Sequence, residues 1–145
     1  MDKTQGAFTI VTDQQLRVLL VKRQDLPIWD LPGGKMENDE EPWETAQREL
    51  FEETGLRTEH LLVLGRYEFS QRADRQWLFI ATDATGMLQV PNEEVRQVGY
   101  FSLQHLPINL VPERRQQLRD FAAGAGDVRK TLTDPRWLCL LKKFL

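Results

Sequence analysis

A short acidic segment in the first half of the chain constrains the fold more than any other feature. Residues 42–54 read PWETAQRELFEET, with Pro42 suited to the first helical position and Gly55 suited to a left-handed stop beyond the last turn. At about 100° per residue, a helix here gathers four residues into one stripe: Trp43, Ala46, Leu50 and Thr54. The sequence therefore predicts a helix that packs this stripe on a core.

The same helix would carry three glutamates on a face roughly opposite the stripe. Glu49, Glu52 and Glu53 stand at i, i+3 and i+4, which are neighbouring positions on a helix surface. Like charges so placed repel by up to about 4 kcal/mol per pair at about 4 Å and an effective dielectric of about 20. A divalent cation would neutralise them, and carboxylates favour magnesium or manganese over zinc. The alternative is a solvated acidic face on a surface helix.

The acidic helix is part of a longer spaced pattern. Five residues separate Gly34 from Glu40, and seven residues separate Glu40 from Arg48. The defined positions are Gly34, Glu40, Arg48, Glu49, Leu50, Glu52, Glu53, Gly55 and Leu56. This pattern resembles the Nudix box at every defined position. The preceding residues 29–35, WDLPGGK, are similar to the approach to the box in that family. Paired glycines there let the backbone come close to a ligand, and exposed N–H groups before a helix suit phosphate.

The resemblance implies an enzyme of the Nudix hydrolases, which cleave nucleoside diphosphates linked to another group. It implies an α/β fold in which a mixed curved β-sheet is sandwiched between helices (α/β/α). It also implies a divalent-metal-dependent pyrophosphohydrolase that uses Mg²⁺, with Mn²⁺ as an alternative. Positioned cations suit this chemistry because phosphoanhydride cleavage develops negative charge on oxygen.

The resemblance also assigns roles to individual residues. Glu52 and Glu53 match metal ligands, whereas Glu49 matches a position that serves either as a ligand or as the base that activates water. Arg48 matches a residue that braces the glutamates by ion pairing. Gly34 would offer its backbone carbonyl to the metal.

An acid from outside the box is expected to join the site. Glu93 and Glu94 precede an apolar segment, and this acidic loop resembles one that lies near the substrate in related proteins. We take Glu94 as the catalytic candidate of the pair. The alternative is a solvated loop.

The rest of the chain indicates further strands and a second helix. Hydrophobic patterning predicts strands over residues 7–12, 17–22, 61–69, 76–83 and 94–101, with the first two forming a hairpin. A second helix is predicted from residue 111 to about 122, and a short terminal helix over 134–142 is an alternative for the tail. Because 145 residues suit one core, we expect a single domain over residues 1–145.

Composition and net charge limit the class of substrate and the location that we expect. The net charge of −3 gives no electrostatic footprint for a long nucleic acid. The small-molecule nucleotide substrate that we expect is implied by the resemblance. No apolar run approaches the length of about 20 residues needed to span a bilayer, and no signal peptide is visible. One cysteine, Cys139, expected in the core, excludes an internal disulfide and fits a cytoplasmic location. The oligomeric state stays open, with a homodimer as one alternative.

Substrate choice is less constrained. The chain lacks a proline near position 71 and a tyrosine just beyond it, features that resemblance associates with cleavage of ADP-ribose and of dinucleoside polyphosphates. This favours a nucleoside triphosphate or a nucleotide sugar. Two alternatives remain: a nucleotide-sensing Nudix module without catalysis, and an RNA 5′-end pyrophosphohydrolase.

Overall fold

The computed structural model describes residues 3–134, which form two helices and eight strands. Helix α1 spans Pro42–Thr54 and helix α2 spans Glu113–Ala122. The strands in chain order are β1 (Thr4–Val11), β2 (Val18–Arg23), β3 (Trp29–Asp30), β4 (Gly33–Lys35), β5 (Leu62–Phe69), β6 (Asp74–Ala81), β7 (Val95–Phe101) and β8 (Val128–Leu132).

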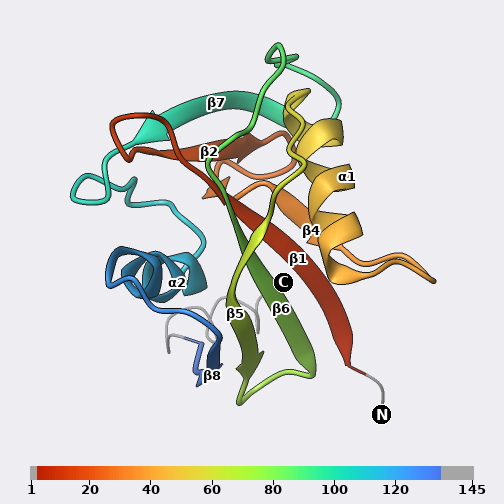
Figure 1. Ribbon diagram of the computed structural model, residues 1–145, viewed down its shortest axis with the longest axis vertical. Coiled ribbons are helices and arrows are strands. Elements are labelled where there is room, and N and C mark those ends of the chain that lie inside the picture. The colour runs from red at the N-terminus through yellow and green to blue at the C-terminus, as the bar shows by residue number, and fades with distance from the viewer. Residues whose placement is uncertain (1–2, 135–145) are drawn as a thin grey trace.

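The strands divide into two sheets. The larger has the order β4-β1-β6-β5-β8 and the smaller has the order β3-β2-β7. Strand β1 pairs parallel with β6 and antiparallel with β4, and β5 pairs antiparallel with β6 and parallel with β8. The larger sheet is therefore mixed, and its long central strands twist across one another in Figure 1.

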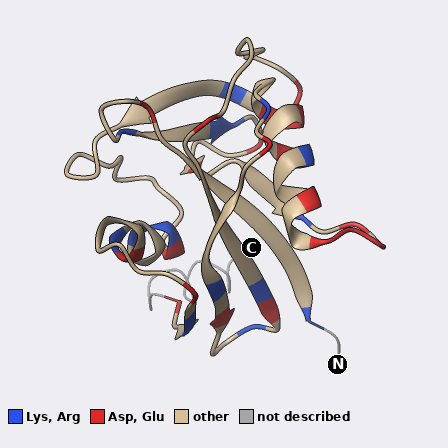
Figure 2. Ribbon diagram, in the orientation of Figure 1, with Lys and Arg blue, Asp and Glu red and all other residues tan. Residues whose placement is uncertain are grey.

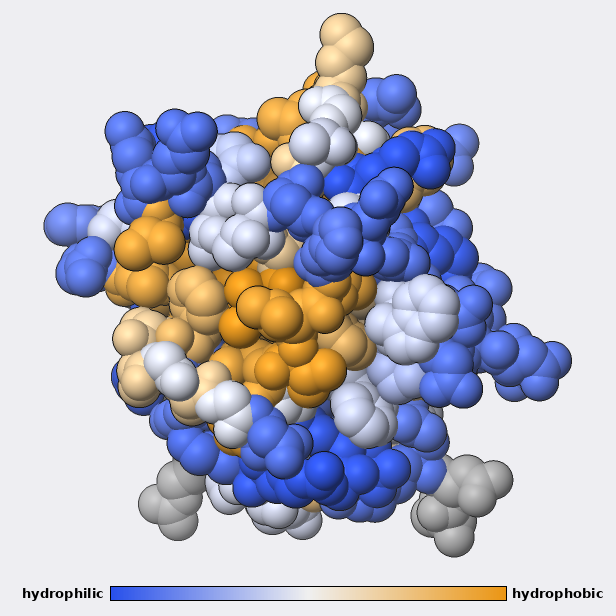
Figure 3. All heavy atoms as spheres, viewed as in Figure 1, coloured by the Kyte–Doolittle hydropathy of each residue, from blue (hydrophilic) through white to orange (hydrophobic). Residues whose placement is uncertain are grey.

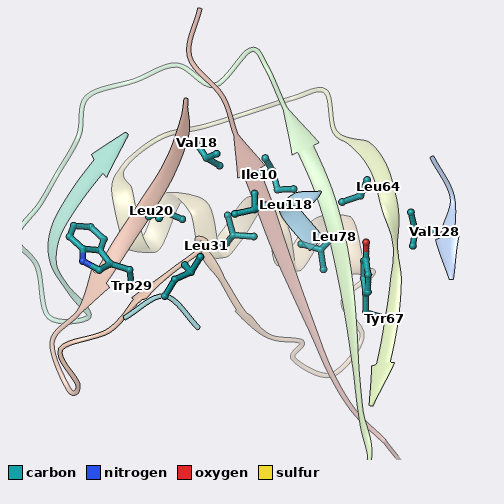
Figure 4. Packing of buried hydrophobic residues seen from close by; sticks show 11 residues of the cluster. Ile10, Val18, Leu20, Trp29, Leu31, Leu64, Tyr67, Leu78, Leu118 and Val128 are labelled. Atoms are coloured by element: carbon teal, nitrogen blue, oxygen red, sulfur yellow. The ribbon is translucent and has the colours of Figure 1, made fainter. Parts of the chain in front are cut away.

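The two helices pack on opposite faces of the larger sheet. Ala46 of α1 packs with Ala7 and Phe79, whereas Leu118 of α2 packs in the main core with Leu78 (Figure 4). Because successive side chains of a strand point to opposite faces, the neighbouring residues 78 and 79 of β6 pack against different helices. The predicted α/β/α fold class is confirmed, with the strands divided between two sheets.

The predicted hairpin between the first two strands is wrong. Strands β1 and β2 belong to different sheets and share only an isolated bridge between Thr12 and Val18. The carboxylate of Asp13 accepts the backbone N–H groups of Gln15 and Arg17, both at 2.9 Å. A side chain therefore helps to close the turn, while the ladder partners of β1 are β4 and β6 and those of β2 are β3 and β7.

Strand β8 was absent from the sequence prediction. Its residues VRKTL are mostly exposed, and it joins the sheet only by pairing in parallel with β5. The predicted terminal helix and Cys139 lie outside the described residues. Within residues 3–134, neither helix has the length and apolar character to cross a membrane. Figure 3 shows apolar side chains gathered at the centre of one face. Leu62 and Val63, at the start of β5, are exposed apolar residues.

Candidate active site

Both ends of α1 are fixed by local interactions. Pro42 follows the N-cap residue Glu41, whose N–H donates to the carboxylate of Glu44 at 2.9 Å. At the other end Gly55 adopts a φ of 83° and donates its N–H to the carbonyl of Phe51 at 2.8 Å. The predicted helix over residues 42–54 is confirmed.

The acidic and apolar sides of α1 adjoin, whereas the sequence predicted that they would be opposed. Ala46 and Leu50 are buried as expected, but Trp43 in the first turn is 50% exposed. Glu53 is only 8% exposed. It follows Ala46 by seven residues, which is about 20° around a helix, so it shares the buried side. Only Glu52 points toward solvent, with 44% of its side chain exposed.

Three carboxylates converge beside this helix. Glu49 and Glu53 of α1 and Glu94, from the loop before β7, each offer an oxygen, and these oxygens lie within 4.8 Å of one another. Within residues 3–134 no other set of three or more acidic, histidine or cysteine side chains converges in this way. The structure thus brings together three of the residues singled out by sequence, two from the box and one from outside it.

Arg48 organises the remaining acids of the box. Its Nε donates to Glu40 at 2.7 Å, and its Nη1 donates to Glu49 at 3.0 Å and to Glu52 at 3.1 Å. This guanidinium lowers the pKa of Glu40 to about 2. Figure 2 shows acidic residues, coloured red, along α1 and the loop that leads into it. Glu52 is therefore held by Arg48 and does not belong to the group of three converging carboxylates.

The electrostatics of the cluster favour a bound cation or proton. Burial raises the pKa of Glu53 well above its usual value, and the negative charges of Glu49 and Asp30 raise it further. Burial also raises the pKa of Glu49, although the positive charge of Arg48 opposes this effect. Both carboxyls thus lose solvation in the fold without gaining enough positive charge from the protein.

The glycine loop before α1 lies against the acids. A Cβ atom on Gly34 would lie 2.7 Å from Cδ and Oε1 of Glu49, so only glycine fits there without moving that side chain. The N–H of Gly33 donates to Glu53 at 3.4 Å. The paired glycines therefore let the backbone lie against the acidic side chains, while its approach to a ligand stays a prediction.

These groups line a cleft of about 630 Å³ between the two sheets and α1. Its walls combine acidic, apolar and backbone groups: Phe8, Val21, Arg23, Gln24, Asp25, Asp30, Leu31, Gly33, Gly34, Glu49, Glu53, Glu93, Glu94 and Val95. Arg23 is the one basic side chain among them, and it pairs with Asp25 at 2.5 Å. The cleft has the size of a small-molecule site. Its converging carboxylate oxygens fit a hard divalent cation such as Mg²⁺ or Mn²⁺.

Sequence reasoning missed two residues that shape this cleft. Asn92 donates from its amide to the backbone carbonyl of Glu53 at 2.9 Å, while its amide oxygen accepts the N–H of Glu94 at 2.9 Å. It therefore ties the end of α1 to the loop that carries the third acid. Its position just before two glutamates, where asparagine often organises a turn, was a usable signal. The second residue, Asp30, lines the cleft and accepts a hydrogen bond from Arg114. Arg114 lies 84 positions later in the chain, so the sequence does not indicate this pair.

Comparison with known proteins bears on the identity of this site. The family model described as a NUDIX domain matches residues 2–121. A protein of Bacillus subtilis (strain 168), named a putative 8-oxo-dGTP diphosphatase, is 39% identical over 98% of this chain and 97% of its own length. A MutT-like protein of Streptomyces ambofaciens is 29% identical over 81% of this chain and 75% of its own. Among solved structures, a mutator MutT protein from Bacillus halodurans superimposes with a TM-score of 0.77 at 22% identity, covering 92% of this chain and 91% of that one.

Proposed function

This chain belongs to the Nudix hydrolase family, and we propose that it hydrolyses nucleoside triphosphates to a nucleoside monophosphate and pyrophosphate with Mg²⁺ bound at the acidic cluster. In this reaction water adds to a phosphorus atom, one bridging P–O bond breaks, and the proton of the water is taken up by a base. The observation that carries the proposal is the convergence of the Glu49, Glu53 and Glu94 oxygens in a cleft large enough for a nucleotide.

The converging carboxylates would hold the metal, together with the backbone carbonyl of Gly34 and with Glu52 once it leaves Arg48. A bound divalent cation neutralises charge on phosphate oxygens and lowers the pKa of its water. Glu49 accepts a hydrogen bond from Arg48, which fixes its direction. Its raised pKa suits a group that takes up a proton during the reaction. Ligand and base thus remain the two roles for Glu49.

The cleft rim would bind the rest of the substrate. Arg23 is the cation available to phosphate oxygens in the lining, and it would exchange its pairing with Asp25 for substrate. A relative 39% identical to this chain is named a putative 8-oxo-dGTP diphosphatase, which makes an oxidised guanine nucleotide the first substrate to examine. We further propose that the protein acts as a single domain in the cytoplasm.

The test is a hydrolysis screen with Mg²⁺ in which both products are separated by ion-exchange chromatography. The panel contains dGTP, 8-oxo-dGTP, the common nucleoside triphosphates, nucleotide sugars and a short RNA with a 5′ triphosphate. We expect a nucleoside monophosphate and pyrophosphate from the triphosphates, with 8-oxo-dGTP among the best substrates. Release of single orthophosphate from the γ position, or no hydrolysis of any compound, would overturn the proposal.

Matched variants separate this proposal from its alternatives. Glu53→Gln should lower turnover about a hundredfold or more, whereas Glu59→Gln, which changes an exposed acid outside the cleft, should leave it unchanged. If the protein were a sensing module, wild type and Glu59→Gln would both bind nucleotides without hydrolysing them. Faster cleavage of the RNA than of any free nucleotide would favour the 5′-end activity.

A further inference from the structure

Helix α2, which packs on the face of the larger sheet opposite α1, carries a fully buried arginine that contacts a residue of the cleft wall. Arg114 is 1% exposed, and its guanidinium lies 3.8 Å from the ring centre of Phe8, a residue that lines the cleft. Its Nη1 donates to the side-chain oxygens of Gln76 at 2.7 Å and Gln117 at 2.9 Å, and its Nε donates to Asp30 at 2.5 Å. A buried charge is costly unless its partners are well placed, so this network fixes the orientation of each member.

The two carboxylate oxygens of Asp30 differ in the hydrogen bonds that they accept. Oδ1 accepts the N–H of Leu31 at 2.7 Å and the Nε–H of Arg114 at 2.5 Å. Oδ2 receives only a long contact of 3.5 Å from Nη2 of Arg114. Because a carboxylate oxygen has two acceptor positions, Oδ2 retains capacity for a further hydrogen bond. Asp30 also lines the cleft, where that capacity can be used.

We propose that Arg114 is a positioning residue that holds Asp30 as a hydrogen-bond acceptor for the nucleoside half of the substrate. The proposal rests on the nucleotide function proposed above. A phosphate group does not suit this wall of the cleft, because a carboxylate repels it. The complementary group is a neutral donor, either an N–H or amino group of the base or a hydroxyl of the sugar. Arg114 would act without touching substrate, by fixing which oxygen of Asp30 faces the cleft.

Replacing Asp30 with asparagine tests whether this side chain accepts a hydrogen bond from the substrate. Because two N–H groups point at Oδ1, the amide oxygen of Asp30→Asn should take that place and leave the amide NH₂ facing the cleft. The substitution thus changes an acceptor into a donor with almost no change in shape. Arg114→Met removes the groups that orient Asp30, and Arg114→Lys keeps the charge but loses the planar fork. Arg119→Met is the control, since Arg119 is an exposed arginine of the same helix.

Binding of nucleoside monophosphates, measured by calorimetry, separates this inference from catalysis. The probes are dGMP, the purine deoxyriboside monophosphate that lacks donors on its base, and the 2′,3′-dideoxy form of GMP that lacks the sugar hydroxyl. Wild type should bind dGMP about tenfold to a hundredfold more tightly than one of the two analogues, as expected for a hydrogen bond to a charged group. The analogue that binds weakly identifies base or sugar as the donor.

The variants then decide the role of Arg114. Asp30→Asn and Arg114→Met should each remove most of the preference for dGMP over the weaker analogue. The double variant should lose no more of this preference than Asp30→Asn alone, and Arg119→Met should keep it. A lowered melting temperature in Arg114→Met with unchanged discrimination would show a structural role only and overturn the proposal. Unchanged discrimination in Asp30→Asn would overturn it as well, which keeps the test valid should Arg114→Met fail to fold. Absence of hydrolysis by wild type would refute the proposed function alone, because these probes report binding.

Discussion

Replacing Glu53 with glutamine should stabilise the metal-free protein while it destroys activity. The oxygens of Glu49, Glu53 and Glu94 lie within 4.8 Å of one another. At that separation each ionised pair repels by about 3 kcal/mol at an effective dielectric of about 20. Partial protonation relieves some of this repulsion, so we expect Glu53→Gln to add about 1–2 kcal/mol to the free energy of unfolding, or about 3–8 °C in melting temperature. Turnover should fall about a hundredfold or more, because a charged ligand is lost.

The pH dependence of this effect has a definite sign. The pKa of Glu53 is raised in the folded protein above the ordinary value of 4.5, so the folded state binds this proton more tightly than the unfolded chain. The resulting stabilisation is complete below pH 4.5 and is lost as the pH rises through the folded-state pKa. The advantage of Glu53→Gln over wild type should therefore be largest near neutral pH and should vanish near pH 4.5.

Thermal unfolding in EDTA and in Mg²⁺, followed by circular dichroism from pH 4.5 to 7.5, measures both effects. Magnesium should raise the melting temperature of wild type by mass action and should raise that of Glu53→Gln much less. A variant that is less stable than wild type in EDTA at pH 7.5 would show that the buried carboxylate is not under electrostatic stress. Wild-type turnover in saturating Mg²⁺ would show that Glu53 holds no essential metal.

Three further substitutions probe the surroundings of the cluster. Gly34→Ala places a methyl group 2.7 Å from Cδ of Glu49, so kcat/KM should fall about a hundredfold with the fold retained, as initial rates and circular dichroism would show. Glu40→Gln should cost about 1 kcal/mol at pH 7 by urea unfolding. Because the hydrogen bond from Arg48 lowers the pKa of Glu40 to about 2, that cost should shrink as the pH falls from 4.5 toward 2. Gly55→Ala imposes a φ of 83° on a residue with a side chain, so urea unfolding should reveal a loss of about 1–2 kcal/mol or more.

Helix α1 and much of the site could be predicted because their signals are local. Pro42 and Gly55 set the ends of the helix through backbone geometry that depends on neighbouring residues alone. The spacing of Glu49 and Glu53 likewise guarantees that they are neighbours on any helix. The spacing of Glu53 from Ala46 places it beside the apolar stripe, but how deeply it is buried depends on how the sheet and the loop before β7 cover that side.

Contacts between distant segments account for the remaining differences. The first two strands carry no signal of their true partners, since β1 pairs with β6 more than sixty residues later. Asp30 and Arg114 are 84 positions apart, and neither residue type indicates the other. Strand β8 is a polar segment that becomes a strand only because β5 offers it a free edge.

The wall of the cleft is shared between the acidic cluster and the connection that joins β2 to β3. The acids stand on α1 and on a loop pinned by Asn92, whereas exposed Gln24 and Asp25 sit on the connection between β2 and β3. That connection contributes no residue to the group of converging carboxylates. Gln24 nevertheless donates its backbone N–H to the carbonyl of Glu94 at 3.0 Å. A different sequence grafted into residues 24–28 should therefore leave the hydrolytic machinery intact only if it keeps this hydrogen bond, which limits how far the connection can be redesigned.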